Sequence, residues 1–203
     1  MNYKRILSKI AHKEFVQNRN DFLTSFRANQ VSSKTWLVDN LVAAMGAGTN
    51  ITNVAVLGSW NSVLLYELLS DVMTIDHWHF YDVNEKVHQD RDMYFSANKM
   101  HKNYTSYTKN VNSLFGKGAD PAFHRLYDLI INPSGEHMDD LHTTWGPIYA
   151  LMSNNYTHLD DGQHINCCTS SLDLKNKNNI SKARIKGTLG LGGYDRYLVI
   201  GQH

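Results

Sequence analysis

The stretch ITNVAVLG, residues 51–58, decides the fold class of this chain. It is a short run rich in β-branched side chains that stops at Gly58, and from Ser62 onward apolar residues recur at helical spacing. A buried strand, a tight turn and a helix in succession are typical of an α/β domain. With 203 residues, the chain is long enough for one such domain with a sizeable core.

Strands and helices alternate on both sides of this unit. We predict strands at 51–57, 75–81, 104–108, 126–131, 164–169, 183–189 and 194–201. We predict helices at 3–26 (one or two), 33–45, from Ser62, 84–98, 120–126 and 138–152, and a mobile polar loop at 172–182. The last two strands are separated by only a glycine-rich turn, which predicts an antiparallel hairpin.

This order of elements predicts an α/β, Rossmann-like sheet of seven strands, mostly parallel, with helices on both faces and the hairpin at the C-terminal end. We expect a single domain over residues 1–203. Within it, residues 1–48 are expected to form a helical segment that packs over a cleft, and residues 51–201 the Rossmann-like core.

The composition narrows the classes of function. Twenty Lys and Arg against nineteen Asp and Glu give a formal charge of +1, so the sequence carries no strong nucleic-acid charge signature. No apolar stretch approaches the roughly 20 residues that cross a bilayer, and the N-terminus lacks the features of a secretory signal. We therefore expect a cytoplasmic protein that does not engage a membrane.

Ligands of open α/β sheets bind beyond the carboxyl ends of the strands, so the residues that follow each strand are the candidates for a site. Gly58 permits a close approach of backbone to ligand, although a plain strand-to-helix turn explains it equally well. Asp82 follows the second strand, 24 residues further on. A carboxylate there can accept both hydroxyls of a ribose, with a solvated loop aspartate as the alternative.

These segments resemble class I S-adenosylmethionine-dependent methyltransferases. The resemblance lies in VAVLGSW as the first motif, FYDVNEK as the acidic second motif, YDLIINPSGEHM as the fourth, and the terminal hairpin that ends RYLVIGQ. In addition, SSKTWLVDNL and INPSGEHM are similar to uncharacterised methyltransferase-like proteins of bacteriophages. Two departures are that the first motif lacks the second and third glycines of the family and that an asparagine replaces its usual acidic residue near the adenine.

The resemblance implies S-adenosylmethionine as the cofactor and assigns residues to its parts. Gly58, Ser59 and Trp60 would lie along the methionine portion and Asp82 at the ribose. The adenine would be surrounded by Val83, Asn110 and Val111. Lys34 or Trp36 would close the cleft from the preceding helix, with a surface lysine and a core tryptophan as the alternatives.

The segment from Asn132 to His137 holds the candidate catalytic residues. Asn132-Pro133 resembles the first half of a motif found in enzymes that methylate exocyclic amino groups, although Ser134 and Gly135 break it. Glu136 and His137 could each serve as a general base beside the methyl group. Equally, Glu136 could cap the next helix and His137 could face solvent.

We expect no metal site, because the histidines lack a recognisable ligand spacing. The leading interpretation is a methyltransferase acting on a small molecule, a nucleotide or a nucleic acid, with an amine as one candidate acceptor. A catalytically silent S-adenosylmethionine-binding accessory protein is the second interpretation. A nicotinamide-dependent oxidoreductase is the third.

Overall fold

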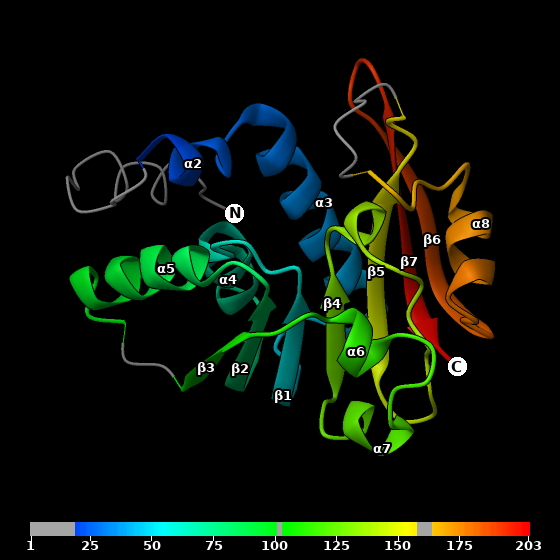
Figure 1. Cartoon of the computed structure of the whole chain (residues 1–203), viewed down its shortest axis with the longest axis horizontal. Coiled ribbons are helices and arrows are strands. Elements are labelled where there is room, and N and C mark those ends of the chain that lie inside the picture. Colours follow the sequence, from blue (N-terminus) through cyan, green and yellow to red (C-terminus); the bar gives the residue numbers. More distant parts are fainter. Residues whose placement is uncertain (1–18, 101–102, 158–163) are drawn as a thin grey trace.

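The computed structural model describes residues 19–100, 103–157 and 164–203. Its seven strands form one sheet in the order β3-β2-β1-β4-β5-β7-β6 (Figure 1). The strands are β1 (Asn50–Leu57), β2 (Thr74–Asp82), β3 (Tyr104–Thr108), β4 (Leu129–Asn132), β5 (Ile148–Asn154), β6 (Lys182–Gly190) and β7 (Asp195–Gln202). Strands β1 to β5 are parallel, and β7 pairs antiparallel with both β5 and β6. The predicted fold class is confirmed.

Helices lie on both faces of this sheet. They are α2 (Arg19–Thr24), α3 (Ala28–Met45), α4 (Val63–Ser70), α5 (Glu85–Ala97), α6 (Asn112–Phe115), α7 (Pro121–His124) and α8 (Ser171–Lys177), with one 3₁₀ turn, η1 (Gly135–His137). None of the described helices is long and apolar enough to cross a membrane. The prediction of helices at 3–26 falls largely on residues 1–18, which lie outside the described residues, as does that part of the predicted segment 1–48.

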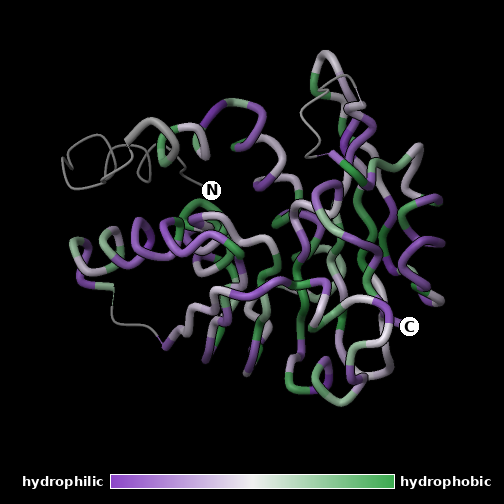
Figure 2. Tube along the Cα trace, viewed as in Figure 1, coloured by the Kyte–Doolittle hydropathy of each residue, from purple (hydrophilic) through white to green (hydrophobic). Residues whose placement is uncertain are grey.

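Two hydrophobic clusters hold the sheet between its helices. Val54 and Val56 of β1 contribute to the cluster on the α3, α4 and α5 side, and Ala55 and Leu57 to the cluster on the other side. All four side chains are fully buried, because the sheet is covered on both faces at β1. Figure 2 shows the same layering, with hydrophobic residues along the central strands and hydrophilic ones over much of α5 and α8.

The C-terminal third of the sequence contains the wrong predictions. Residues 138–152 form no helix, and 148–154 form β5 instead. This strand is buried on both faces and shows no alternation, so its sequence lacks the usual strand pattern. Residues 164–169 form no strand; instead, the backbone N–H of Cys168 donates to the carbonyl of Asn154, at 2.9 Å.

The predicted mobile loop over 172–182 is also wrong, since residues 171–177 form α8. The Ser170 hydroxyl accepts a hydrogen bond from the backbone of Asp173, at 3.0 Å. Asp173 Oδ2 in turn accepts the backbone N–H of Thr169, at 2.9 Å. Ser170 is thus the N-cap of α8, and the Asp173 carboxylate holds the residue before the cap; serine is a favoured residue at this position.

Candidate functional site

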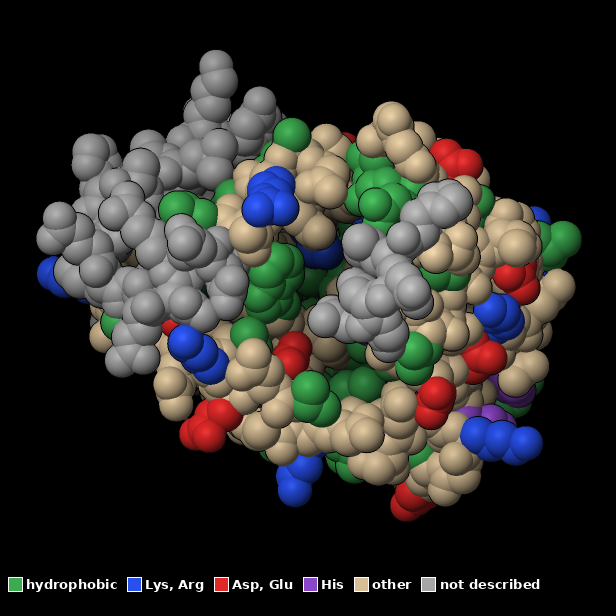
Figure 3. All heavy atoms as spheres, turned by 45° about the horizontal axis from the view of Figure 1, so that its top comes forward, with side chains coloured by type: hydrophobic (Ala, Val, Ile, Leu, Met, Phe, Trp, Pro, Cys, Tyr) green, Lys and Arg blue, Asp and Glu red, His purple; other side chains and the backbone are tan. Residues whose placement is uncertain are grey.

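The carboxyl ends of β1 to β4 open onto a cleft of about 630 Å³. It is visible as a hollow in the space-filling view, with hydrophobic and acidic side chains along its rim (Figure 3). The predicted site residues that line it are Gly58, Trp60, Asp82, Val83, Asn110, Val111 and His137. The structure thus brings together residues from four loops, as the rule for open α/β sheets predicts.

The turn between β1 and α4 has an unusual backbone. Gly58, Trp60 and Ser62 all have positive φ angles, of 55°, 45° and 51°. A non-glycine residue in this region costs about 1 kcal/mol or more, so hydrogen bonds within the turn and to β2 have to hold this backbone. The backbone N–H of Ser59 donates to the carbonyl of Tyr81, at 2.9 Å, and the Ser62 hydroxyl donates to the carbonyl of Ser59.

Asp82 connects this turn to the end of β2. Its Oδ2 accepts the backbone N–H of Trp60, at 2.8 Å, and its Oδ1 accepts that of Asn84, at 3.0 Å. Each carboxylate oxygen can accept a further hydrogen bond. Asp82 therefore shapes the floor of the cleft and retains acceptor capacity toward it.

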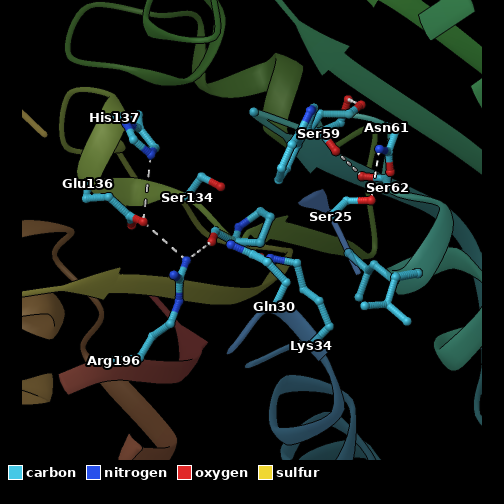
Figure 4. Close-up of a pocket in the computed structure, with 15 residues that line it drawn as sticks. Ser25, Gln30, Lys34, Ser59, Asn61, Ser62, Ser134, Glu136, His137 and Arg196 are labelled. Atoms are coloured by element: carbon cyan, nitrogen blue, oxygen red, sulfur yellow. Dashed lines mark hydrogen bonds and ion pairs between the residues drawn. The ribbon is translucent and has the colours of Figure 1, made fainter. Parts of the chain in front are cut away.

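A smaller pocket of about 100 Å³ adjoins the cleft beneath α3. Lys34 and Gln30 reach toward it from α3, and Glu136 and His137 from the loop after β4 (Figure 4). Ser59 of the predicted set also lines this pocket. Four residues are common to the pocket and the cleft: Gly58, Trp60, Ser134 and His137.

Glu136 is buried and paired with Arg196 of β7. The distance from Glu136 Oε1 to Arg196 Nη2 is 3.2 Å, and their side chains are 3% and 4% exposed. Asn154 also donates to this Oε1, at 2.9 Å, while Glu136 Oε2 has no hydrogen-bond partner among the described residues. The pocket therefore contains a buried carboxylate oxygen that can accept a hydrogen bond.

Lys34 interacts electrostatically with both members of the Glu136–Arg196 pair. Burial, together with repulsion by the Arg196 guanidinium, lowers the pKa of Lys34 from 10.5 to about 7, and attraction by Glu136 only partly offsets this. Glu136 is itself paired with Arg196, so the two cations lie around the same carboxylate. The Lys34 amine is therefore poised between its charged and neutral forms near neutral pH.

His137 lies where the two cavities meet. Its Nε2 is 3.9 Å from Glu136 Oε1, and its ring packs edge-on against His164 with 4.6 Å between centroids. Its side chain is 38% exposed, so the imidazole can reach solvent or a ligand. Of the three predicted catalytic residues, His137 has the most open position.

Two predicted residues point elsewhere. The Asn132 amide oxygen accepts the backbone N–H of Ser134, at 3.1 Å, and its nitrogen lies 3.2 Å from the Met138 sulfur. Trp36 packs over Gly187 of β6, where an added Cβ would lie 2.8 Å from the indole. Neither is among the residues that line the cleft or the pocket.

Several residues of the site were not among those predicted from the sequence. Arg196 pairs with Glu136, Met138 and Ile165 line the cleft, and Ser134 lines both cavities. Arg196 stands directly before the buried run YLVI, and a charged residue leading into a buried strand was the available signal. Among the described residues, no group of three or more His, Cys, Asp or Glu could hold a metal ion.

No protein-family model matches the chain, and no curated protein matches it in sequence. Solved structures do match. A SAM-dependent methyltransferase from Leishmania major has a TM-score of 0.58 at 10% identity, over 98% of this chain and 82% of that chain. A candidate S-adenosyl-L-methionine-dependent methyltransferase from Methanococcus maripaludis has a TM-score of 0.57 at 10% identity, over 94% and 95% of the two chains.

The N-methyltransferase NodS from Bradyrhizobium japonicum has a TM-score of 0.57 at 8% identity, over 88% of this chain and 99% of that chain. The chain has the methyltransferase fold. In this chain the antiparallel β7 lies between β5 and β6, as the predicted C-terminal hairpin requires.

Proposed function

We propose that the chain is an S-adenosylmethionine-dependent methyltransferase. The observation that carries the proposal is the meeting of two cavities at Gly58, Trp60, Ser134 and His137, at the carboxyl edge of a methyltransferase-type sheet. The larger cavity suits an adenosine in volume, and the smaller one suits the amino-acid end of the cofactor. The reacting centre then falls at their junction.

The larger cleft offers hydrogen-bond acceptors and apolar contacts for adenosine. The Asp82 carboxylate would accept hydrogen bonds from the ribose hydroxyls. Each of its oxygens already accepts one backbone N–H, from Trp60 or Asn84, and can accept one more hydrogen bond. Val83 and Val111 would enclose the adenine, and Asn110 lies beside them. Val83 is 69% exposed at the rim, and a bound ring would cover this apolar side chain.

The smaller pocket fits a group that carries both an ammonium and a carboxylate. Glu136 Oε2 is buried without a partner among the described residues, and an ammonium would supply the missing donor. Lys34 would pair with the carboxylate of the ligand. This group would supply the counter-ion that Glu136, which is paired with Arg196, does not provide. These two residues therefore match the amino-acid end of S-adenosylmethionine.

When bound, S-adenosylmethionine supplies an already activated methyl group. The protein has to align the acceptor and, for some acceptors, to remove a proton. His137 stands at the junction of the cavities and would accept that proton. Glu136, held by Arg196 and Asn154, would orient the loop that carries His137, and the Asn132 amide would shape the same loop.

The acceptor is a small molecule, a nucleotide or a nucleic acid, with an amine as one candidate nucleophile. The predicted similarity to methyltransferase-like proteins of bacteriophages stays a prediction. So do the single domain over 1–203 and the placement of 1–48 over the cleft.

Calorimetric titration tests the cofactor. We expect binding of S-adenosylmethionine and S-adenosylhomocysteine, and weaker binding of 5′-methylthioadenosine, which lacks the amino-acid end that the Lys34 pocket would hold. Binding of a nicotinamide dinucleotide without binding of S-adenosylhomocysteine would overturn the proposal. Incubation with methyl-labelled cofactor and separated small-molecule and RNA fractions then distinguishes an enzyme from a silent accessory protein, which would label neither.

A further inference from the structure

One face of the sheet is only partly covered near β2 and β3. The connection from β3 to β4 contains two helices of four residues each, α6 and α7, in place of one long helix. On this face His77, His79, Thr105 and Tyr107 remain half-buried. The short helices leave room for a ligand where a longer helix would cover the strands.

A groove of about 450 Å³ occupies this space. Rings form most of its wall: His79, Tyr81, Tyr107, Phe123 and Tyr127. Tyr107 stacks on Tyr81 with 4.6 Å between ring centroids, and His79 stacks on Tyr107 at 5.9 Å, both with an interplanar angle of 8°. The volume falls in the range of small-molecule sites, roughly 300–1,000 Å³, and the lining is of the apolar kind such sites have.

Most polar groups in the wall are already engaged. The Tyr81 and Tyr127 hydroxyls bond each other at 2.5 Å. His79 Nδ1 lies 3.3 Å from the Tyr107 hydroxyl, and its Nε2 lies 3.2 Å from Asn53 Oδ1. Burial and the neighbouring His77 lower the pKa of His79 to about 4, so its ring is uncharged at neutral pH. The wall therefore presents neutral ring surfaces.

Lys109 is the one charged residue that lines the groove, among the described residues. It is exposed, and it also lines the 630 Å³ cleft at the strand ends. A cation beside neutral rings complements a ligand that combines a planar ring with an anionic group. The position of Lys109 places that anion between the groove and the cleft.

We propose that this groove is a second binding site, for a planar aromatic group that carries an anion, of the kind found in a nucleotide. The ring lies among His79, Tyr107 and Phe123, and the anion pairs with Lys109. The site does not depend on the proposed methyl transfer, since only Lys109 belongs to both cavities. A ligand bound here lies next to the cleft, so the two sites compete or cooperate through Lys109.

Nuclear magnetic resonance titration tests the site, with and without saturating S-adenosylhomocysteine. Uridine 5′-monophosphate, 4-hydroxybenzoate, uridine and inorganic phosphate serve as probes. We expect the two aromatic anions to shift the ring signals of His79 and Tyr107, uridine to bind several-fold more weakly, and phosphate to leave these signals unchanged. The stronger of the two anions identifies a nucleotide or an aromatic acid as the ligand type. The proposal is wrong if no aromatic probe shifts these signals.

Variants separate the groove from the cleft. Leu126→Trp enlarges a side chain that is 58% exposed and lines the groove, and should weaken probe binding at least tenfold with unchanged S-adenosylhomocysteine affinity. Lys109→Met should weaken the binding of uridine 5′-monophosphate and 4-hydroxybenzoate several-fold and leave the binding of uridine unchanged. Lys117→Met is the matched control, an exposed lysine of the same connection that does not line the groove. Equal probe binding by all three variants would overturn the proposal even if S-adenosylhomocysteine binds.

Discussion

Glu136 and Arg196 form a buried ion pair that ties the loop after β4 to the antiparallel strand β7. Arg196 Nη2 also donates to the carbonyl of Pro133, at 2.5 Å (Figure 4). One guanidinium thus holds two points of the loop that carries His137. The C-terminal hairpin, through β7, therefore has a direct part in shaping the candidate site.

Removing one partner of this pair should be strongly destabilising. Arg196→Met removes the hydrogen-bonded partner of the buried Glu136 carboxylate and leaves Lys34 as the other cation of the pocket; breaking such a buried pair typically costs about 3–5 kcal/mol. The double variant Glu136→Gln/Arg196→Met should recover most of this loss, because the introduced amide keeps an acceptor for Asn154 and carries no charge. Denaturant unfolding measures the free energy of unfolding of both variants.

The control for this pair is Arg184→Met, the same substitution on the neighbouring strand β6. Arg184 is exposed and its hydrogen bonds to Ala44 and Gln202 lie at the surface, so its loss should cost less than about 1 kcal/mol. If Arg196→Met and the double variant were equally unstable, the cost would lie in packing and not in the unpaired charge.

Asp82→Asn should weaken S-adenosylhomocysteine binding by roughly 1.5–3 kcal/mol, about 10- to 150-fold, through loss of charged hydrogen bonds. Calorimetry measures the change. Asp76→Asn is the matched control, because Asp76 is exposed on the same strand and does not line the cleft. Similar affinities for the two variants would remove Asp82 from the binding site.

Lys34 should make cofactor binding depend on pH. In the empty pocket the pKa of Lys34 is about 7, and a carboxylate favours the protonated amine. Affinity for S-adenosylhomocysteine should therefore be highest below pH 7 and fall by up to tenfold per pH unit above it. Lys34→Arg should flatten the profile, while Lys34→Met should flatten it and weaken binding. A wild-type affinity that is constant from pH 6 to pH 9 would contradict this role.

The same residue should lower the stability of the ligand-free protein. Between about pH 7 and its ordinary pKa of 10.5, Lys34 is neutral in the folded state and protonated in the unfolded state. The unfolded state then binds more protons, so this residue makes stability rise with pH across that window. At pH 7 or below, Lys34→Met should stabilise the empty protein by about 0.5–2 kcal/mol, measured by denaturant unfolding.

Gly58→Ala and Gly192→Ala should separate backbone strain from a cleft contact. Both glycines have positive φ, 55° and 77°, so each alanine should cost about 1 kcal/mol of stability. A Cβ on Gly58 would lie 2.5 Å from Met138 Cε, whereas one on Gly192 meets nothing within 4 Å. We expect only Gly58→Ala to weaken S-adenosylhomocysteine binding, because Met138 lines the cleft. Equal affinities of the two variants for S-adenosylhomocysteine would contradict this expectation.

Several elements could be predicted from the sequence because their signals are local. The run at 51–57, its stop at Gly58 and the helix that follows appear as predicted, and so does the hairpin of β6 and β7. The position of Asp82 at the end of β2 follows from the same patterns. These features depend on residues within a few positions of one another, where hydrophobic spacing and turn chemistry act directly.

The strand β5 could not be predicted in this way. Ile148–Asn154 is buried along nearly its whole length, so it has the unbroken apolar run that a buried helix also has. The run at 164–169 looked more like a strand, yet it crosses the ends of β5 and η1 through hydrogen bonds to Asn154 and Glu136. Only pairing with β4 and β7 decided which segment enters the sheet.

By itself, the sequence determined the α/β class, the Gly58 turn, the Asp82 carboxylate and the closing hairpin. Only the tertiary structure decided that Arg196 meets Glu136 and that Lys34 lies in the same pocket. Among the residues that line this pocket, Glu136 offers the one carboxylate to both cations. The physical reason is distance along the chain. Hydrophobic spacing acts over a few residues, whereas these charges come from α3, the loop after β4, and β7, and meet only when strand order brings the three together.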